Sequence, residues 1–251
     1  MKRLTVTIGL AALVVFSLLF VTRPTGLPAD ALPIHPVNVA NGERLFHAGG
    51  CVSCHSSSDT ESIRPVLGGG LAMETPFGTF HVPNISPHPV HGIGGWSRLD
   101  FINAMQMGTS PDGRHYYPAF PYASYVRMSF EDLMDLQSYL ETLPEAEDSN
   151  KDHDLKFPWN IRAGIGLWKL VNLDPNPIVS VPGEDVLLMR GRYLVEGPGH
   201  CGECHTPRNW NGGLDHDRWL AGAPDPEGEG KVPNITPGGK SLKGWSQGDI
   251  E

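Results

Sequence analysis

The sequence predicts a mainly α, loop-rich protein with two similar domains in tandem after an N-terminal apolar helix. The chain of 251 residues contains 30 glycines and 23 prolines, a composition that favours many turns and short helices. A pentapeptide of the form C-x-x-C-H occurs at 51–55 and again at 201–205, and the two copies use all four cysteines. Further segments recur at an offset of about 150 residues, which indicates a duplication.

The two pentapeptides predict two covalently bound c-type haems. Cysteines three positions apart lie about one helical turn from each other, so both sulfurs can reach the vinyl groups of one porphyrin. The histidine that follows projects its imidazole onto the iron as the proximal ligand. A structural zinc site is the alternative, but a four-cysteine site needs no histidine after each pair. The predicted attachment residues are Cys51, Cys54, Cys201 and Cys204, and the predicted proximal iron ligands are His55 and His205.

The repeated segments predict two class I cytochrome c domains. Residues 191–194 resemble 42–45, residues 232–236 resemble 82–86, and residues 244–246 resemble 95–97. The predicted organisation is a membrane anchor or signal segment at 1–23, a linker at 24–36, domain 1 at 37–145, a connector at 146–183 and domain 2 at 184–251.

The N-terminus predicts export. Lys2 and Arg3 precede an uncharged run over 4–22, which as a helix measures about 28 Å, close to the thickness of the hydrocarbon core of a bilayer. Basic residues before the run place the start of the chain inside and the rest outside. We therefore expect a transmembrane helix in the bacterial inner membrane, with the body in the periplasm. A cleaved signal peptide is the alternative, because Ala29-Asp30-Ala31 resembles a cleavage site.

The first domain contains recognisable local elements. A short helix at 41–46 leads to Cys51, and a weakly alternating segment at 77–85 favours a strand. Ser97 and Ser129 are typical N-caps, each with an aspartate three residues later. Tyr117, Phe120 and Tyr122 lie in an aromatic and proline-rich loop that suits the wall of a haem pocket, and Pro144 stops the last helix.

The first iron needs a sixth ligand, and a soft thioether suits an electron carrier because it favours Fe(II). Met128 precedes the last helix of the domain, in a loop where a distal ligand is expected. Met107 and Met73 are the alternatives, together with a histidine or an open site. Met105 and Met134 fall on helix faces and are expected to pack in the core.

The second domain is expected to be incomplete. The first domain continues for almost fifty residues past Trp96, whereas the chain ends six residues past Trp245. We expect the sequence to be a fragment, and otherwise the second iron would be five-coordinate or bound by His216. Between the domains, the charged residues 145–154 predict a solvated connector, and the apolar stretch 161–173 predicts an inter-domain helix.

Several motifs resemble those of exported cytochrome c subunits of membrane-bound alcohol, gluconate and sugar dehydrogenases, and of related diheme cytochromes c. These are GGCVSCH, FHVPNIS, GGWS, DGRHYYPAFPYASYVRMS and CGECHTPRN. The resemblance implies His/Met-ligated haem and supports Met128. The chain departs from the dehydrogenase subunits in two respects. Those subunits carry three haem motifs and this chain carries two, and this chain is expected to end inside its second domain.

The expected function is electron transfer without chemistry on a substrate. The donor is expected to be the catalytic subunit of a dehydrogenase or a quinone, and the acceptor another cytochrome or an oxidase of the respiratory chain. A formal charge of −9 argues against nucleic acid as a partner. The alternatives are a diheme peroxidase, in which one iron is open, and a haem subunit of a terminal oxidase complex.

Overall fold

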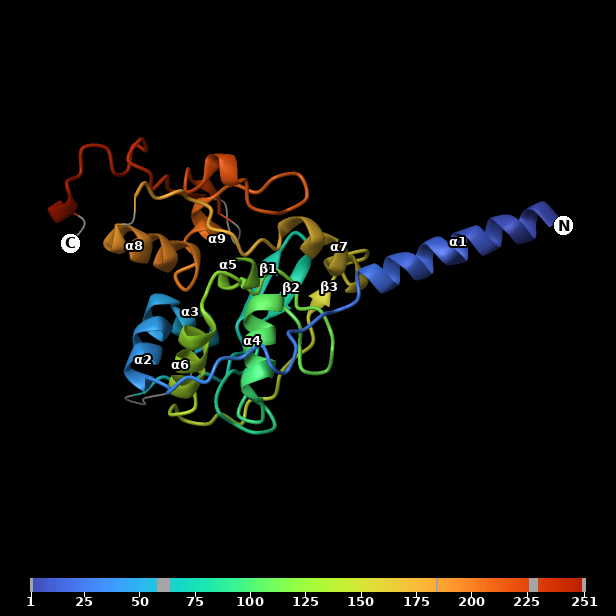
Figure 1. Cartoon of the computed structure of the whole chain (residues 1–251), viewed down its shortest axis with the longest axis horizontal. Coiled ribbons are helices and arrows are strands. Elements are labelled where there is room, and N and C mark those ends of the chain that lie inside the picture. Colours follow the sequence, from blue (N-terminus) through green and yellow to red (C-terminus); the bar gives the residue numbers. More distant parts are fainter. Residues whose placement is uncertain (1, 58–63, 184, 226–229, 250–251) are drawn as a thin grey trace.

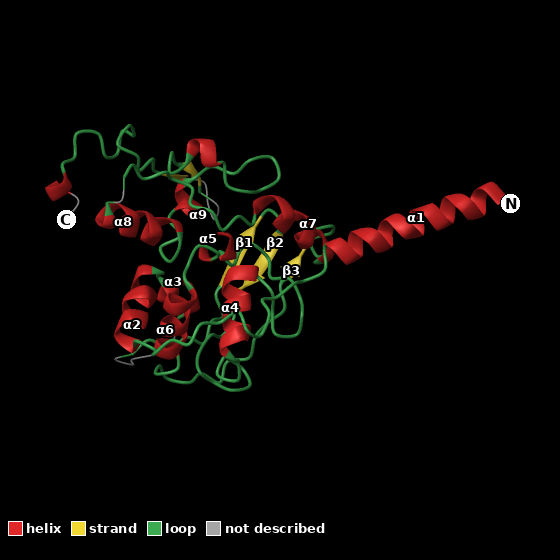
Figure 2. Ribbon diagram, viewed as in Figure 1, coloured by secondary structure: helices red, strands yellow, loops and turns green. Residues whose placement is uncertain are grey.

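The computed structural model describes residues 2–57, 64–183, 185–225 and 230–249, and most of them form loops (Figure 2). The helices are α1 (Lys2–Val21), α2 (Val39–Ala48), α3 (Cys51–His55), α4 (Arg98–Met107), α5 (Tyr122–Tyr125), α6 (Phe130–Leu140), α7 (Ala163–Asn172), α8 (Val186–Glu196) and α9 (Gly202–His205), with 3-10 turns η1 (His216–Arg218) and η2 (Gln247–Asp249). The strands are β1 (Ala72–Thr75), β2 (Gly78–His81), β3 (Asp154–Leu155), β4 (Ala223–Pro224) and β5 (Lys231–Val232).

Helix α1 extends away from the body of the protein (Figure 1). The side chains at 1–5 and 11 lie outside the described residues. The sequence predicts that residues 1–23 span a membrane, but within the part of the chain that the structure describes, no helix is both long and apolar enough to do so. The apolar side chains described on α1, from Val6 to Val21, are exposed.

The core of the first domain is built where α2 crosses α6. Gly42 makes this crossing possible, because a Cβ there would collide with the carbonyl oxygen of Asp135 and lie 2.9 Å from the Cβ of Tyr139. Around the crossing, Leu45, Phe46, Leu133 and other apolar side chains form one buried cluster. The paired helices of the core therefore approach as closely as their backbones allow.

Both predicted N-caps are confirmed. The Ser97 hydroxyl accepts from the backbone N–H of Asp100, whose carboxylate accepts from the backbone N–H of Ser97, which completes a capping box at α4. The Ser129 hydroxyl accepts from the backbone N–H of Asp132 at the start of α6. The carboxylate of Asp132 is used differently, since it accepts hydrogen bonds from Asn41 of α2 and from the Tyr193 hydroxyl of α8.

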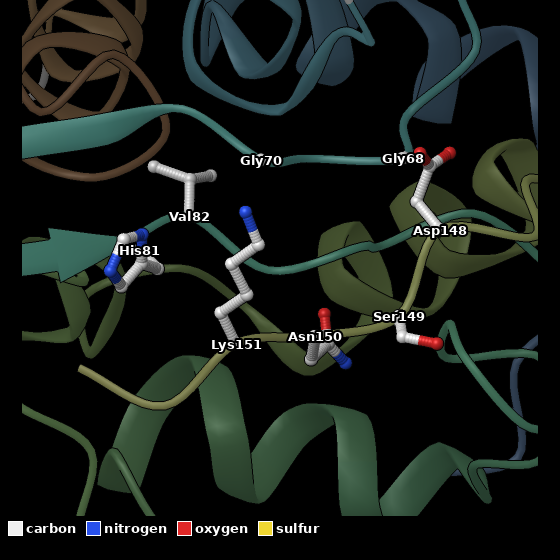
Figure 3. Close-up of a pocket in the computed structure, with 8 residues that line it drawn as sticks. All are labelled: Gly68, Gly70, His81, Val82, Asp148, Ser149, Asn150 and Lys151. Atoms are coloured by element: carbon white, nitrogen blue, oxygen red, sulfur yellow. The ribbon is translucent and has the colours of Figure 1, made fainter.

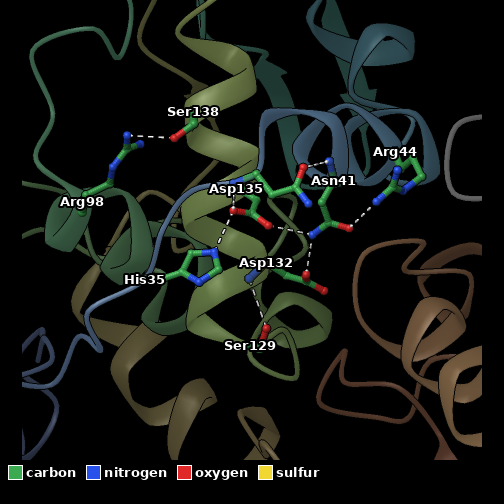
Figure 4. A network of polar contacts seen from close by, with 9 residues as sticks. His35, Asn41, Arg44, Arg98, Ser129, Asp132, Asp135 and Ser138 are labelled. Carbon is green, nitrogen blue, oxygen red and sulfur yellow. Dashed lines mark hydrogen bonds and ion pairs between the residues drawn. The ribbon is translucent and has the colours of Figure 1, made fainter. Parts of the chain in front are cut away.

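A buried carboxylate fastens the segment before α2 to α6 (Figure 4). Asp135 accepts hydrogen bonds from the His35 ring at 2.8 Å, the Asn38 backbone N–H at 2.7 Å and the Asn41 side chain at 2.8 Å. Burial opposes the ionisation of Asp135, but these donors outweigh it and lower its pKa. Earlier in the same segment, the Leu27 N–H donates to the Asn103 side chain. The predicted linker at 24–36 is thus extended and bonded along the first domain.

The segment predicted as strand-like contributes β2, the central strand of a small antiparallel sheet. The strand order is β1-β2-β3, with Ala72 opposite His81 and Gly78 opposite Leu155. The partner β3 belongs to the charged stretch after the first domain. This stretch is mostly exposed, as predicted, yet Asn150 accepts from the backbone N–H of Asn84 and so holds it against the first domain.

The predicted helix at 161–173 is confirmed as α7, which packs where α1 ends. A Cβ on Gly166 would collide with the carbonyl oxygen of Thr22, so the two backbones are in contact. The Lys169 ammonium donates to the carbonyls of Met107 and Gly108 and to Nδ1 of His115. Burial lowers the pKa of Lys169 to about 8. Helix α7 therefore joins the end of α1 to the first domain.

The second repeat begins with α8 and α9 and continues through the paired strands β4 and β5. Its layout follows the first domain, with a helix leading to each C-x-x-C-H segment. In α8, Gly191 corresponds to Gly42 of α2, but a Cβ there would meet nothing within 4 Å among the described residues. The apolar side chains from Val186 to Met189 at the start of α8 are exposed.

Candidate haem-attachment sites

The first C-x-x-C-H segment forms the single helical turn α3, as its spacing predicts. Gly50 precedes it with φ of 58°, a left-handed value that glycine adopts without strain. Cys51 and Cys54 are thiols and not disulfides, with Cys51 partly buried and Cys54 exposed. Burial raises the pKa of the Cys51 thiol to about 12. The turn α3 thus carries two thiols and one imidazole within five residues, directly after α2.

The His55 imidazole is held by a backbone carbonyl. Its Nδ1–H donates to the carbonyl oxygen of Pro83 at 2.8 Å, which fixes the tautomer and leaves the lone pair of Nε2 for a metal. Burial lowers the pKa of His55 and outweighs this hydrogen bond, so the ring is neutral near pH 7. A neutral imidazole with its second nitrogen already bonded is the form that ligates iron.

The second site repeats this arrangement. The Nδ1–H of His205 donates to the carbonyl oxygen of Pro233, also at 2.8 Å, and in both sites the two residues are 28 positions apart. Sequence analysis finds the repeated Val-Pro-Asn-Ile segments but misses their role as partners of the histidines. The constant separation from each C-x-x-C-H motif is the signal that points to that role.

The proline carbonyl of the first site is itself anchored. Asn84 follows Pro83, is buried, and donates to the carbonyls of Ala146 and Asp148, both at 2.9 Å. Its side-chain oxygen accepts from the backbone N–H of Ser86 at 2.8 Å. The backbone carbonyl of His55 accepts a hydrogen bond from the N–H of Gly69 at 2.9 Å. These hydrogen bonds hold the loop that carries the Pro83 carbonyl, and through it the His55 ring, against the connector.

A polar pocket of about 270 Å³ lies between the glycine segment behind His55 and the connector (Figure 3). Gly68 and Gly70 form one wall, and Asp148 and Lys151 extend into it from the other. It is lined by Gly68, Gly70, His81, Val82, Asp148, Ser149, Asn150 and Lys151, so the haem-attachment residues are not part of it.

The donor set fits covalent haem at both sites. Each has two thiols within one helical turn, followed by an imidazole whose Nδ1 is hydrogen-bonded to a proline carbonyl, which leaves Nε2 for the iron. Over the described residues, no group of three or more His, Cys, Asp or Glu side chains converges as a metal site. The four cysteines therefore do not gather as a four-cysteine zinc site requires.

The structure buries Met128, the predicted distal ligand, in the apolar cluster against which Cys51 packs. The Met128 carbonyl accepts from the Gln106 side chain at 2.7 Å, which holds the loop before α6. The alternatives Met107 and Met73 are half-buried, on α4 and β1. Met105 and Met134 lie in the core, as predicted. The role of Met128 as an iron ligand stays a prediction.

The three aromatic residues predicted to wall the first haem are brought into one region. Tyr117 and Tyr122 are buried, and Phe120 packs edge-on against Tyr122. The hydroxyl of Tyr122 is buried without a hydrogen-bond partner in the structure. Burial raises the pKa of Tyr122 far above its ordinary value, with the nearby Glu203 carboxylate adding to the effect. The region is therefore apolar and reaches the second C-x-x-C-H segment.

His216, the alternative ligand for the second iron, lies on the exposed turn η1. Its ring packs edge-on against Trp219 with centroids 6.0 Å apart. It also lines a pocket of about 170 Å³ together with Arg127 and Asp174. Burial, followed by the Arg127 charge, lowers the pKa of His216. These contacts place His216 beside cationic and acidic side chains at the junction of the two repeats.

Two such attachment turns, each with an oriented histidine, define a c-type haem protein. The family model described as "Cytochrome c" matches residues 39–144. Over 254 aligned residues the chain is 48% identical to a "Diheme cytochrome c-type" protein of Cereibacter sphaeroides, covering 99% of this chain and 83% of that one. The chain belongs to the cytochrome c family, carries covalent haem c and has the electron-transfer role of that family.

Other relatives are subunits of dehydrogenases. The chain is 36% identical to the "Fructose dehydrogenase cytochrome subunit" of Gluconobacter japonicus, over 91% of this chain and 46% of that one. It is 39% identical to the "Gluconate 2-dehydrogenase cytochrome c subunit" of Pantoea cypripedii, over 80% and 44%. The chain thus spans less than half the length of these two dehydrogenase subunits.

Proposed function

We propose that this protein is an exported diheme cytochrome c that carries electrons from a dehydrogenase to the respiratory chain at the periplasmic face of the bacterial inner membrane. The observation that carries the proposal is the pair of attachment turns with the same histidine–proline hydrogen bond at the same separation. Two sites of one design suit a relay in which neither site acts on a substrate.

The residues of the chain would hold and tune the cofactor. When bound, haem supplies an iron that changes reversibly between Fe(III) and Fe(II). The cysteine pairs fix the porphyrin, and the carbonyls of Pro83 and Pro233 orient His55 and His205 and raise their basicity as ligands. A Met128 thioether on the first iron would favour the reduced state and raise the potential.

The relatives support a dehydrogenase as the donor, since the two described above are cytochrome subunits of fructose and gluconate dehydrogenases. A quinone is the other candidate donor, and a second cytochrome or an oxidase would accept the electrons. The apolar side chains that α1 exposes from Val6 to Val21 support attachment of the protein to the membrane.

The test is expression of the chain with haem-maturation machinery, followed by a count of covalent haem per polypeptide. We expect two haems, and one in a Cys201→Ala/Cys204→Ala variant. A purified sugar or alcohol dehydrogenase with its substrate should then reduce the haems, and the loaded protein should not turn over hydrogen peroxide. Absence of covalent haem, or peroxide turnover without reduction by any dehydrogenase, would overturn the proposal.

A further inference from the structure

The residue directly before the second cysteine pair has a strained backbone. His200 adopts φ of 36°, a left-handed value that glycine adopts more readily than any other residue. In the first domain the corresponding position is Gly50, with φ of 58°. The backbone at this position would therefore suit a glycine, so the contacts of the His200 side chain are the feature to consider.

The side chain of His200 reaches the first haem-attachment segment. Its Nε2–H donates to the carbonyl oxygen of Gly49 at 3.1 Å, and a carbonyl can only accept. The ring packs edge-on against Tyr125, with centroids 5.5 Å apart and an interplanar angle of 81°. Tyr125 is a buried member of the apolar cluster against which Cys51 packs. The strained residue of one repeat is thus bonded to the other repeat at its haem site.

The neighbouring contacts bring the same two segments together. A Cβ on Gly49 would lie 3.2 Å from the carbonyl oxygen of Pro198. The two segments that precede the cysteine pairs are therefore in contact. Within the second motif, Glu203 accepts a hydrogen bond from Ser124 of α5 at 2.9 Å. That carboxylate is also paired with Arg208 at 2.7 Å and is largely buried. The second attachment turn is therefore hydrogen-bonded to the first domain through Glu203.

We propose that His200 is a positioning residue that holds the two haem-attachment segments together and provides a bonded route for electrons from one segment to the other. The second half of this proposal rests on the proposed electron-carrier function. From Cys51 the route follows the backbone to Gly49, crosses one hydrogen bond to His200, and enters Cys201 through the adjoining peptide. The side chain of Tyr125 fills the space beside this crossing.

The test compares two glycine substitutions in the haem-loaded protein. His200→Gly releases the strain and removes the contact, whereas Leu220→Gly releases a similar left-handed strain, φ of 57°, elsewhere in the second repeat. The backbone N–H groups of Gly49, Gly50 and Cys201 are hydrogen-bonded, so their exchange with solvent deuterium reports opening of the two segments. Inter-haem electron transfer is measured after flash reduction of one haem.

We expect His200→Gly to fold, to exchange these amides about fivefold faster because a hydrogen bond between the segments is lost, and to slow inter-haem transfer. Leu220→Gly should change neither quantity. His200→Asn, which tolerates left-handed backbone but has a shorter side chain, should behave as His200→Gly does. Amide exchange needs no electron donor, so it tests the contact even where the proposed donor is wrong. If His200→Gly exchanges these amides and transfers electrons between the haems at the rates of the unsubstituted protein, the proposal is overturned.

Discussion

The Nδ1 of His55 lies 2.8 Å from the carbonyl oxygen of Pro83. In the second repeat, the carbonyl oxygen of Pro233 lies at the same distance from the Nδ1 of His205. A backbone carbonyl is a partner that no side-chain substitution removes. The hydrogen bond is therefore sensitive to what holds the loop around Pro83, which makes the buried Asn84 side chain the natural place to test it.

Asn84→Ala should destabilise the first domain by about 1–3 kcal/mol, because the carbonyls of Ala146 and Asp148 in the connector lose their donor. The matched variant is Asn234→Ala in the second repeat, where the half-buried side chain accepts from Thr236, two residues away. That variant should cost less than about 1 kcal/mol. Denaturant unfolding of both variants measures the difference, and equal losses would show that Asn84 does not anchor the loop.

The helix crossing predicts opposite results for two glycines. Gly42→Ala places a methyl group against the carbonyl of Asp135 and should destabilise the protein by about 1–3 kcal/mol. Gly191→Ala, at the corresponding position of α8, meets nothing within 4 Å and should be neutral or stabilise by up to about 1 kcal/mol. Thermal unfolding followed by circular dichroism separates the two. A destabilising Gly191→Ala would mean that α8 is covered in solution.

Met128→Ala should leave both covalent haems in place but lower the potential of the first haem and open its iron to carbon monoxide, because the thioether is lost. The control is Met107→Ala, which removes a half-buried methionine from α4. Its potential and its carbon monoxide binding should match those of the parent protein. The reverse pattern, with Met107→Ala opening the iron, would transfer the ligand assignment to Met107.

Acid should weaken the joint between α1 and the first domain. His115 donates from Nε2 to the Thr22 carbonyl and accepts the Lys169 ammonium at Nδ1, so the folded protein holds the ring neutral. Burial lowers its pKa from 6.5. As the pH falls below 6.5, the unfolded chain binds this proton first, and stability decreases until the folded pKa is passed.

The measurement is thermal unfolding between pH 5 and 8. His115→Gln should flatten the acid side of the profile, while His47→Gln, which changes an exposed histidine of α2, should leave the slope unchanged. An identical slope in all three proteins would assign the acid sensitivity to other groups, such as His153, whose pKa burial also lowers.

The sequence predicts the elements whose causes are local. The caps at Ser97 and Ser129 depend on a residue three positions away, and the attachment turns on a spacing within five residues. The mainly α, loop-rich class and the internal repeat follow from the same kind of short pattern. Because these signals need no tertiary contact, they could be found without the structure.

The remaining contacts join residues far apart in the chain. The His55–Pro83 bond spans 28 positions, and the His35–Asp135 bond spans 100. The strand β3 has only two residues, and it forms because β2 is beside it. Likewise, residues 24–36 have the composition of a loose linker, and distant partners such as Asn103 on α4 and Asp135 on α6 fix them. Polar side chains carry no pattern that names such distant partners.

The joint at Thr22 determines how this cytochrome would meet its partners. The Thr22 carbonyl is bonded by His115 and abutted by Gly166, and the segment that follows is fastened along the first domain. Under the proposed attachment to the membrane, α1 is therefore joined rigidly to the first domain and does not act as a flexible tether. The carrier would keep a constant distance from the membrane and a constant orientation to it. It would therefore meet a partner by lateral diffusion in the membrane and by rotation about the membrane normal.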